Sequence, residues 1–351
     1  MSAMRERPAI AIALGDPAGI GPEIAIKAAL DPHVRELCTP LLVGDMNVAK
    51  GHAALCGIDV AFDSVAEGAR PMPSDRAIAF LHRDLIDAGA LKLGEIDPAH
   101  GRAAVGAGRA AVEAALQGQV DAVIAAPQTE LSIKQAGIEF DGYPSFVARC
   151  TGTPIEDAYL MICFDTSRIV HLSLHLSLRR AIELVTTDRV LHCIRTTAST
   201  LRAMGIAAPR IAVAGLNPHA GEHGMFGEED DAIIAPAIAV GRAEGIEIDG
   251  PIGADIMFER PGYDAFLVMY HDQGHIAAKL LAPRRIAGLT IGTPILFSSV
   301  AHGSALDIAG KNQASPAAVI EAVERLAKAA AFRRAASAPN LHGEMDAHAG
   351  A

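Results

Sequence analysis

The sequence predicts an α/β protein with a largely parallel sheet. Three observations support this fold class: apolar runs of strand length recur along the chain, helical patterns separate them, and polar residues follow several of the runs directly. Strands that alternate with helices pair in parallel, because each crossover between them contains a helix. A chain of 351 residues is long enough for two packed lobes.

The first elements follow one another closely. Residues 8–14 form an apolar run typical of a buried strand, and Pro22 suits the first turn of a helix that ends near Leu30. The other predicted strands cover 39–43, 122–126, 158–164, 168–174, 210–215 and 265–270, and the other predicted helices cover 103–117, 187–204, 228–243 and 316–333. Residues 335–351 lack apolar periodicity, so we expect a disordered tail.

Composition excludes several classes of function. The net charge of -11 argues against nucleic acid as a partner, because phosphate binding needs a concentrated basic surface. No apolar run reaches the roughly 18 residues of a membrane span, so no membrane partner is expected. The five cysteines lack CxxC spacing and the first residues do not form a signal peptide. We therefore expect reduced thiols in a cytoplasmic protein.

Three histidines follow predicted strands. His175, His219 and His271 each come shortly after an apolar run, and ligands of α/β proteins collect outside the carboxyl ends of the strands. Three imidazoles that meet there are the usual minimum for a divalent metal with one open position. His171 and His175 fit one strand equally well on spacing alone, so the residues leave that choice open.

Residues close to these histidines suggest further roles. Asp272 is adjacent to His271 and is a candidate for orienting it. Lys279 would serve as a general acid or base if it lay near the metal, and its alternative is an ordinary surface lysine.

The glycine-rich turn at 15–23 suits either an anion site at a helix N-terminus or a tight turn that needs small residues. The loop at 302–311 has glycines that would let a flat ligand approach closely.

Several segments together carry a family resemblance. They are Gly15-Asp16-Pro17-Ala18-Gly19-Ile20-Gly21-Pro22-Glu23, Leu216-Asn217-Pro218-His219-Ala220-Gly221-Glu222, Gly250-Pro251 with Ala254-Asp255, Tyr270-His271-Asp272-Gln273-Gly274, and His302-Gly303-Ser304-Ala305 with Ile308-Ala309-Gly310. This set resembles the 4-hydroxythreonine-4-phosphate dehydrogenase family of NAD-dependent, metal-dependent decarboxylating dehydrogenases.

The resemblance implies a two-lobed fold like that of isocitrate and isopropylmalate dehydrogenases, with the active site in the cleft between the lobes. Residues 8–130 plus 288–333 would form the first lobe, which carries the NAD-binding loop. Residues 131–287 would form the second lobe, with the metal ligands and the interface of a homodimer that shares its active sites.

The family pattern also assigns residues. It places the metal on His175, His219 and His271, and the segment at 174–178 selects His175 over His171. Zinc suits three imidazoles best, and magnesium, manganese, cobalt and iron are alternatives. Lys279 falls on a substrate-contacting lysine, and Asp255 on an acidic position near the metal; with Asp272 they form the expected catalytic group. The cofactor contacts would be His302, Gly303, Ser304, Ala305 and Asp307.

Departures from the family pattern change the expected substrate. Tyr143 and Ser145 replace part of a Gly-His-Thr-Glu segment, Phe297 stands where an arginine would grip phosphate, and Gly288 stands where an asparagine would lie. Losing the arginine removes a bidentate anion contact and adds an apolar wall. Tyr143, Ser145 and Phe297, with His275, instead resemble the branch that oxidises cis-dihydrodiol dicarboxylates, of which terephthalate dihydrodiol dehydrogenase is the example. Tyr143, Ser145, Phe297 and Lys279 are the expected substrate contacts.

The expected activity is therefore NAD-dependent and divalent-metal-dependent oxidation of a hydroxy carboxylate, followed by decarboxylation. A cis-dihydrodiol carboxylate is the favoured small-molecule substrate, and 4-hydroxythreonine 4-phosphate is the alternative. A metal-dependent hydrolase or lyase without NAD is an alternative of another class, and a metal-dependent sensor is a non-enzymatic one.

Overall fold

A computed structural model describes residues 7–282 and 286–337. Within them the strands are β1 (Ala9–Ala13), β2 (Thr39–Gly44), β3 (Ala61–Ser64), β4 (Ala77–His82), β5 (Ala122–Ala125), β6 (Tyr159–Phe164), β7 (Ser167–His171), β8 (Arg210–Ala214), β9 (Glu247–Ile252), β10 (Ala265–Val268), β11 (Ala287–Ile291) and β12 (Phe297–Val300). The helices are α1 (Gly21–Leu30), α2 (Pro32–Leu37), α3 (Met46–Leu55), α4 (Pro98–Leu116), α5 (Glu130–Gln135), α6 (Tyr143–Thr151), α7 (Leu178–Glu183), α8 (Thr187–Ala203), α9 (Ala235–Ala243), α10 (Ala254–Met257), α11 (His271–Leu281) and α12 (Ala317–Ser337).

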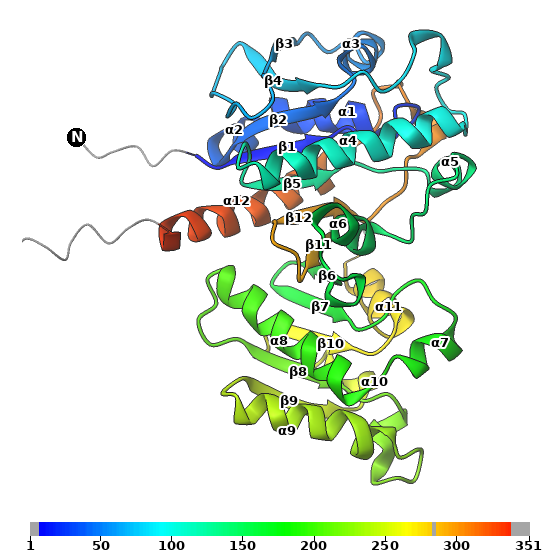
Figure 1. Ribbon diagram of the computed structural model, residues 1–351, viewed down its shortest axis with the longest axis vertical. Helices are drawn as coiled ribbons and strands as arrows, with labels where there is room; N and C mark the ends of the chain where they lie inside the picture. Colours follow the sequence, from blue (N-terminus) through cyan, green and yellow to red (C-terminus); the bar gives the residue numbers. More distant parts are fainter. Residues whose placement is uncertain (1–6, 283–285, 338–351) are drawn as a thin grey trace, which may run out of the picture.

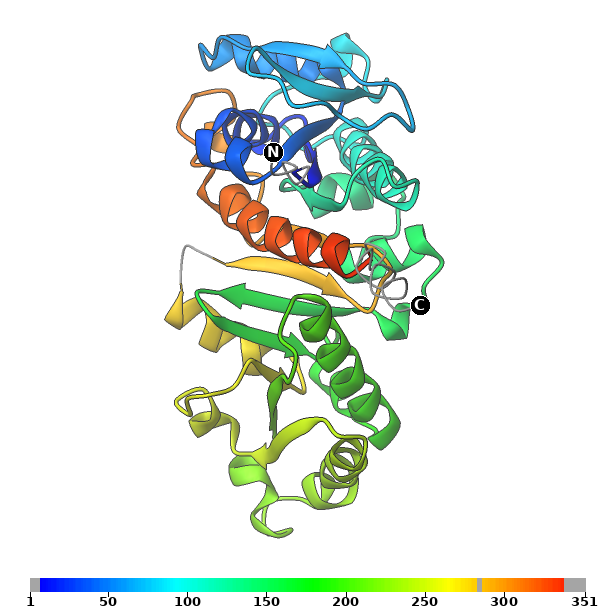
Figure 2. The same cartoon turned by 90° about the vertical axis from the view of Figure 1, so that its left-hand side faces the viewer.

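One sheet runs through the described molecule. Its 12 strands lie in the order β3-β4-β2-β1-β5-β12-β11-β6-β7-β10-β8-β9, along the long axis in Figures 1 and 2. Pairing is parallel except in the middle, where β11 is antiparallel to β12 and to β6, and β6 is antiparallel to β7. The predicted α/β class with a mostly parallel sheet is confirmed.

Strand β1 shows how the sequence separates the two layers of the first half. Ile10 and Ile12 belong to the same core as Ile24 of α1, whereas Ala9 and Ala11 face the other core, which contains alanines of α4. Successive side chains of a strand point to opposite faces. Alanine on one face therefore lets the alanine-rich α4 pack closely, and isoleucine fills the wider space on the other.

The structure adjusts three predicted elements. The helix expected at 103–117 begins at Pro98, because the carboxylate of Asp97 accepts a hydrogen bond from the N–H of Ala99 at 2.7 Å and caps it. The helix expected at 228–243 is a π-turn at Asp230–Ile234 that continues into α9. The disordered tail predicted from residue 335 is wrong for 335–337, which end α12; residues 338–351 lie outside the described part of the chain.

The central antiparallel strands join the two halves. Because β12, β11 and β6 are hydrogen-bonded neighbours, the sheet continues from the first predicted lobe into the second without a break. The lobe boundaries at 8–130 plus 288–333 and at 131–287 stay a prediction. In the described residues, no helix is both long and apolar enough to cross a membrane.

Candidate active site

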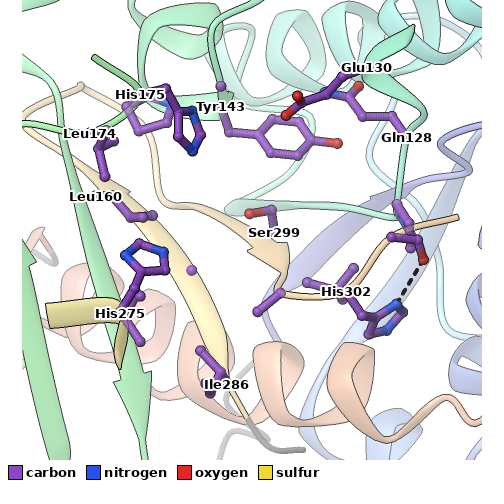
Figure 3. A pocket seen from close by; sticks show the side chains of 18 of the residues that line it. Gln128, Glu130, Tyr143, Leu160, Leu174, His175, His275, Ile286, Ser299 and His302 are labelled. Carbon is purple, nitrogen blue, oxygen red and sulfur yellow. Dashed lines mark hydrogen bonds between the residues drawn. The ribbon is translucent and has the colours of Figure 1, made fainter. Parts of the chain in front are cut away.

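A cavity of about 380 Å³ opens over the central strands, between α11 and the loops that follow β5 and β12 (Figure 3). It collects side chains from both halves of the sheet. Its lining residues are Pro127, Gln128, Glu130, Phe140, Gly142, Tyr143, Pro144, Leu160, Ile162, Leu174, His175, His275, Lys279, Ile286, Gly288, Ser299, Val300, Ala301, His302 and Gly303. Figure 3 shows His175 and His275 on one side, with Gln128, Glu130 and His302 on the other.

Two of the predicted metal ligands lie together. The rings of His175 and His271 have centroids 5.6 Å apart. His175 Nδ1 donates to the carbonyl oxygen of Asp141 at 3.0 Å, and His271 Nδ1 lies 2.7 Å from the carboxylate of Asp272. Both contacts leave Nε2 available, which is the arrangement that carbonyl and carboxylate partners impose on metal-binding histidines.

Asp141 is itself held by neighbours from α6. Its carboxylate accepts hydrogen bonds from the hydroxyl of Ser145 and, at 2.7 Å, from Arg149. Burial pushes the pKa of Asp141 upward, but these hydrogen bonds outweigh it and lower the pKa. Ser145 is not among the residues that line this cavity, but it lines a neighbouring hollow together with His175.

His219 lies in a different environment from the other two predicted ligands. It occupies the loop after β8 with a φ of 52°, and its ring packs edge-on against Phe226 with centroids 5.8 Å apart. Asp255, at the start of α10, is near this loop, because a Cβ at Gly253 would lie 2.7 Å from the Asp255 carboxylate and 3.4 Å from His219 Cα. Among the described residues no group of three His, Cys, Asp or Glu side chains is close enough to hold a metal.

The donor set nevertheless suits a divalent ion. His175 and His271 offer two imidazole nitrogens whose ring partners are a carbonyl and a carboxylate, the groups that set a histidine for metal binding. A metal ion held by these two ligands would have room for at least one more. The described residues place no third ligand beside His175 and His271. The residues present therefore fit an incomplete metal site.

Two more histidines adjoin this pair. His275 stacks on His271, with centroids 3.8 Å apart and ring planes 10° apart, and its Nδ1 lies 3.0 Å from Nε2 of the buried His171. Burial and the charge of His271 lower the pKa of His275 to about 4. Burial, followed by the charge of His275, lowers the pKa of His171 well below its ordinary value. Both rings are therefore neutral near neutral pH.

The aromatic residues form one wall. Tyr143 lines the cavity, its hydroxyl donates to the carbonyl of Ala126 at 3.1 Å, and burial raises its pKa. Phe297 is buried in β12 and packs behind Tyr143 with ring centroids 5.2 Å apart. Phe297 is not among the lining residues. The sequence predicted that Phe297 would form the apolar wall itself, whereas in the structure it supports that wall from behind Tyr143.

The predicted cofactor loop borders the same cavity. His302 and Gly303 line it, and no atom lies within 4 Å of a Cβ built on Gly303. Ser304 is buried: its carbonyl accepts from Ile20 N–H at 2.8 Å, and its hydroxyl accepts from Thr129 at 3.0 Å. Asp307 is exposed and lies further along the loop.

The glycine-rich turn at 15–23 supports this loop. A Cβ at Gly19 would lie 2.7 Å from Ser304, and a Cβ at Gly21 would lie 2.2 Å from the carbonyl of Leu14. Ala305 follows with a φ of 40°. These contacts favour the tight-turn reading, in which small residues let the turn and the loop pack together.

Lys279 completes the polar side. It lines the cavity from α11, two turns beyond His271, and within the described part of the chain its Nζ makes one long contact, of 3.4 Å, with the carbonyl of Ala301. Gln128 and Glu130 also line the cavity and were not singled out from the sequence. Their position directly after the strand ending at Ala125 was the available signal, since the carboxyl ends of strands carry sites.

Comparisons with known proteins find dehydrogenases as relatives. A protein of Symbiobacterium thermophilum, provisionally named as a D-threonate 4-phosphate dehydrogenase, is 41% identical over 94% of this chain and 99% of its own length. The structure of a terephthalate 1,2-cis-dihydrodiol dehydrogenase from Burkholderia xenovorans is 41% identical, with a TM-score of 0.68 over 92% of this chain and 98% of that one. The structure of the 4-hydroxythreonine-4-phosphate dehydrogenase of Klebsiella pneumoniae is 34% identical, with a TM-score of 0.82 over 92% of this chain and 99% of that one.

The fold, the cavity and these relatives define an oxidoreductase, specifically a dehydrogenase. The sequence model of pyridoxal phosphate biosynthetic protein PdxA matches residues 36–326, and the chain belongs to that family. The family predicted from the sequence segments is thus confirmed. The hydrolase or lyase and the sensor that the sequence left as alternatives are wrong.

Proposed function

We propose that the protein oxidises a 3-hydroxy carboxylate with NAD and a divalent metal, preferably zinc, and then decarboxylates it in the cytoplasm. Oxidation of the CH–OH group to a carbonyl transfers a hydride to NAD⁺ and releases the hydroxyl proton. The product is a β-keto acid, whose C–C bond to the carboxylate breaks to release carbon dioxide. The electron pair of that bond forms an enolate, which then takes a proton.

His175 and His271 would hold the metal, and the loop from His302 to Asp307 would hold NAD. When bound, the metal lowers the pKa of the substrate hydroxyl, and NAD accepts the hydride. Lys279 would bind the substrate carboxylate with its ammonium group before decarboxylation. Asp272 would keep His271 oriented, and Asp255 would support the loop of His219.

A cis-dihydrodiol carboxylate is the substrate class that the cavity supports best. The observation that carries this choice is the apolar part of the lining, which includes Phe140, Tyr143, Leu160 and Ile286. Among the described lining residues, Lys279 is the one lysine or arginine. A phosphate normally engages several cations or backbone amides, whereas a carbocyclic ring packs on apolar side chains.

Phosphorylated substrates remain the second candidate. The relative from Symbiobacterium thermophilum, 41% identical, is named for D-threonate 4-phosphate, which supports this reading. 4-Hydroxythreonine 4-phosphate, named in the Klebsiella pneumoniae structure, is the third compound to test. NADH formation with each compound, with and without added zinc, magnesium or manganese, decides among them. Turnover of a phosphorylated compound alone would overturn the dihydrodiol assignment.

We also propose a homodimer in which the partner completes the metal site. A hollow on the outer side of His175 and His271 is lined by Leu174, Leu176 and Leu178, and both Leu176 and Leu178 are exposed. His219 is exposed as well and lies apart from the other two ligands. A partner subunit would cover this apolar hollow and deliver its own copy of His219.

Mixed dimers test the shared site. His175→Ala and His219→Ala should each be inactive, but subunits mixed after mild unfolding should regain about a quarter of wild-type activity, because half of the dimers then carry one intact site. If mixed dimers are shown to form but enzyme activity does not recover, the shared site is contradicted.

A further inference from the structure

One face of α11 presents a line of polar side chains to the cavity region. His271, His275 and Lys279 are spaced four residues apart, so they project from successive turns of the same face. His275 and Lys279 line the cavity, and His271 stacks on His275 with ring centroids 3.8 Å apart. His275 therefore stands between the metal end of the site and the lysine.

A buried histidine holds His275 from behind. His171, at the end of β7, is 1% exposed, and its Nε2 lies 3.0 Å from His275 Nδ1. Gly274 makes this contact possible, because a Cβ there would lie 2.4 Å from His171 Nε2. Glycine within a helix costs stability relative to alanine, so its presence in α11 matches the space that the imidazole of His171 needs.

The contact leaves His275 with one nitrogen for a ligand. Its Nδ1 is engaged by His171, and Figure 3 shows the His275 ring at the cavity wall, across from Ser299 and His302. The hydrogen bond between the facing nitrogens holds one proton, which either ring can carry, so Nε2 of His275 is an acceptor in one arrangement and a donor in the other. A hydroxyl group both donates and accepts, and it satisfies either arrangement.

We propose that His275 binds the substrate hydroxyl on the carbon between the oxidised carbon and the carboxylate, and that His171 is its positioning residue. The substrate is then a 2,3-dihydroxy carboxylate. The inference rests on the proposed function for the placement of the other two substrate groups. The oxidised hydroxyl lies near His175 and His271, and the carboxylate lies near Lys279. The order of the three groups on such a substrate follows the order of the three side chains on α11.

The substrate class includes both leading candidates of the proposed function. A ring dihydrodiol whose first carbon bears a hydroxyl and a carboxylate has this arrangement, and so does threonate 4-phosphate. The retained hydroxyl is thus the shared feature, whereas the ring or phosphate beyond it differs between the two.

Tartrate and malate are the probes, because these two dicarboxylates differ by one hydroxyl. Calorimetric titration of the full-length protein with one equivalent of zinc should show that tartrate binds roughly tenfold more tightly than malate. His275→Leu should remove this preference. His171→Leu should reduce it to about twofold, and His171→Gln, whose amide reaches a similar position, should restore most of it.

Gly274→Ala is a second variant that leaves both imidazoles in the chain. Its Cβ would displace His171, so the preference for tartrate should fall although the helix propensity of α11 rises. Thermal unfolding would verify that each variant is folded. A purely structural role for His171 would weaken the binding of tartrate and malate equally and leave their ratio unchanged.

The outcomes separate this inference from the proposed function. Equal binding of tartrate and malate by the wild type, no detectable tartrate binding, or a preference that persists in His275→Leu would overturn the role of His275, even if NADH forms from a dihydrodiol. A tartrate preference that depends on His275 would support the inference even if none of the three proposed substrates produces NADH, and only the proposed oxidation would then fail.

Discussion

His271 Nδ1 lies 2.7 Å from the carboxylate of Asp272, the residue that follows it at the start of α11. The carboxylate side chain is largely exposed, yet its charge reaches the proposed metal through the imidazole, since a carboxylate partner makes Nε2 more basic. A neighbour in sequence thus supplies the orientation that many metal sites obtain from a distant residue.

Asp272→Ala should weaken zinc binding by about 10- to 100-fold, the range typical for loss of such a partner. Asp272→Asn should weaken it less, because its amide oxygen still accepts from Nδ1. Zinc affinity measured by competition with a chromophoric chelator checks the order of the variants. Asp59→Ala, at an exposed position far from the histidines in sequence, is the matched control. Equal affinity in all proteins would remove Asp272 from the site.

Phe297 should affect both stability and substrate binding through Tyr143. Phe297→Ala should cost about 3–5 kcal/mol of the free energy of unfolding, as loss of a buried aromatic ring usually does. It should also raise KM, because Tyr143 loses the ring behind it. Tyr143→Phe should cost about 1 kcal/mol through the lost bond to the Ala126 carbonyl. Urea unfolding and steady-state kinetics measure the two effects, and an unchanged KM in Phe297→Ala would contradict the supporting role.

Two glycines of the proposed NAD site should respond in different ways. Gly303→Ala should leave the melting temperature unchanged, because its Cβ meets no atom within 4 Å, but it should weaken NAD binding by reducing close approach. Gly19→Ala should lower the melting temperature, because its Cβ would lie 2.7 Å from Ser304. Thermal unfolding and calorimetric NAD titration separate the two. NAD affinity that survives Gly303→Ala would place the cofactor elsewhere.

Lys279 should matter for the carboxylate of the substrate. Lys279→Gln should lower kcat/KM by about 10- to 100-fold, the effect expected from losing a hydrogen bond between charged groups. Among the described residues its Nζ has a single hydrogen bond, of 3.4 Å, so the fold should be unaffected. Lys134→Gln, at the end of α5, is a control of the same charge change. Comparable kcat/KM values in both variants would show that Lys279 is an ordinary surface lysine without a role in substrate binding.

The sequence predicted the fold where the pattern was strong. The apolar runs at β1, β6, β8 and β10 were expected within one or two residues, because strands buried on both faces are nearly continuous in apolar residues. Strands β11 and β12 were missed. They are short and contain Gly, Ser and Thr, and tertiary pairing with β5 and β6 makes them strands.

The site was predicted in part for a related reason. His175, His271 and Lys279 were found from residue type and family pattern, and the structure places them around one cavity region. Ser145 and Phe297 occupy the positions expected from the pattern but support other residues instead of lining the cavity. Gln128 and Glu130 were missed, because a short polar loop after a strand has no periodic pattern and only three-dimensional proximity shows that it faces the cavity.

His52 should give the fold a dependence on pH that is separate from the active site. It is 1% exposed, and its Nε2–H donates to the carbonyl of Pro17 at 2.8 Å, beneath the glycine-rich turn. Burial lowers the pKa of His52 below the ordinary 6.5, although the bond to Pro17 and the charges of Glu23 and Asp16 oppose that change. A proton added to Nδ1 would find no hydrogen-bond partner among the described residues.

The sign follows from the lowered pKa. Above pH 6.5 the imidazole is neutral in both the folded and the unfolded chain, so the full stability is present. As the pH falls below that value, the unfolded chain binds the proton first, and the folded state loses stability until the folded pKa is passed. His52→Gln can keep the bond to Pro17 but cannot titrate, so its free energy of unfolding should fall less than that of the wild type between neutral and mildly acidic pH. Urea unfolding at a series of pH values measures this difference, and a gap between the two proteins that does not change with pH would contradict the neutral, buried state of His52.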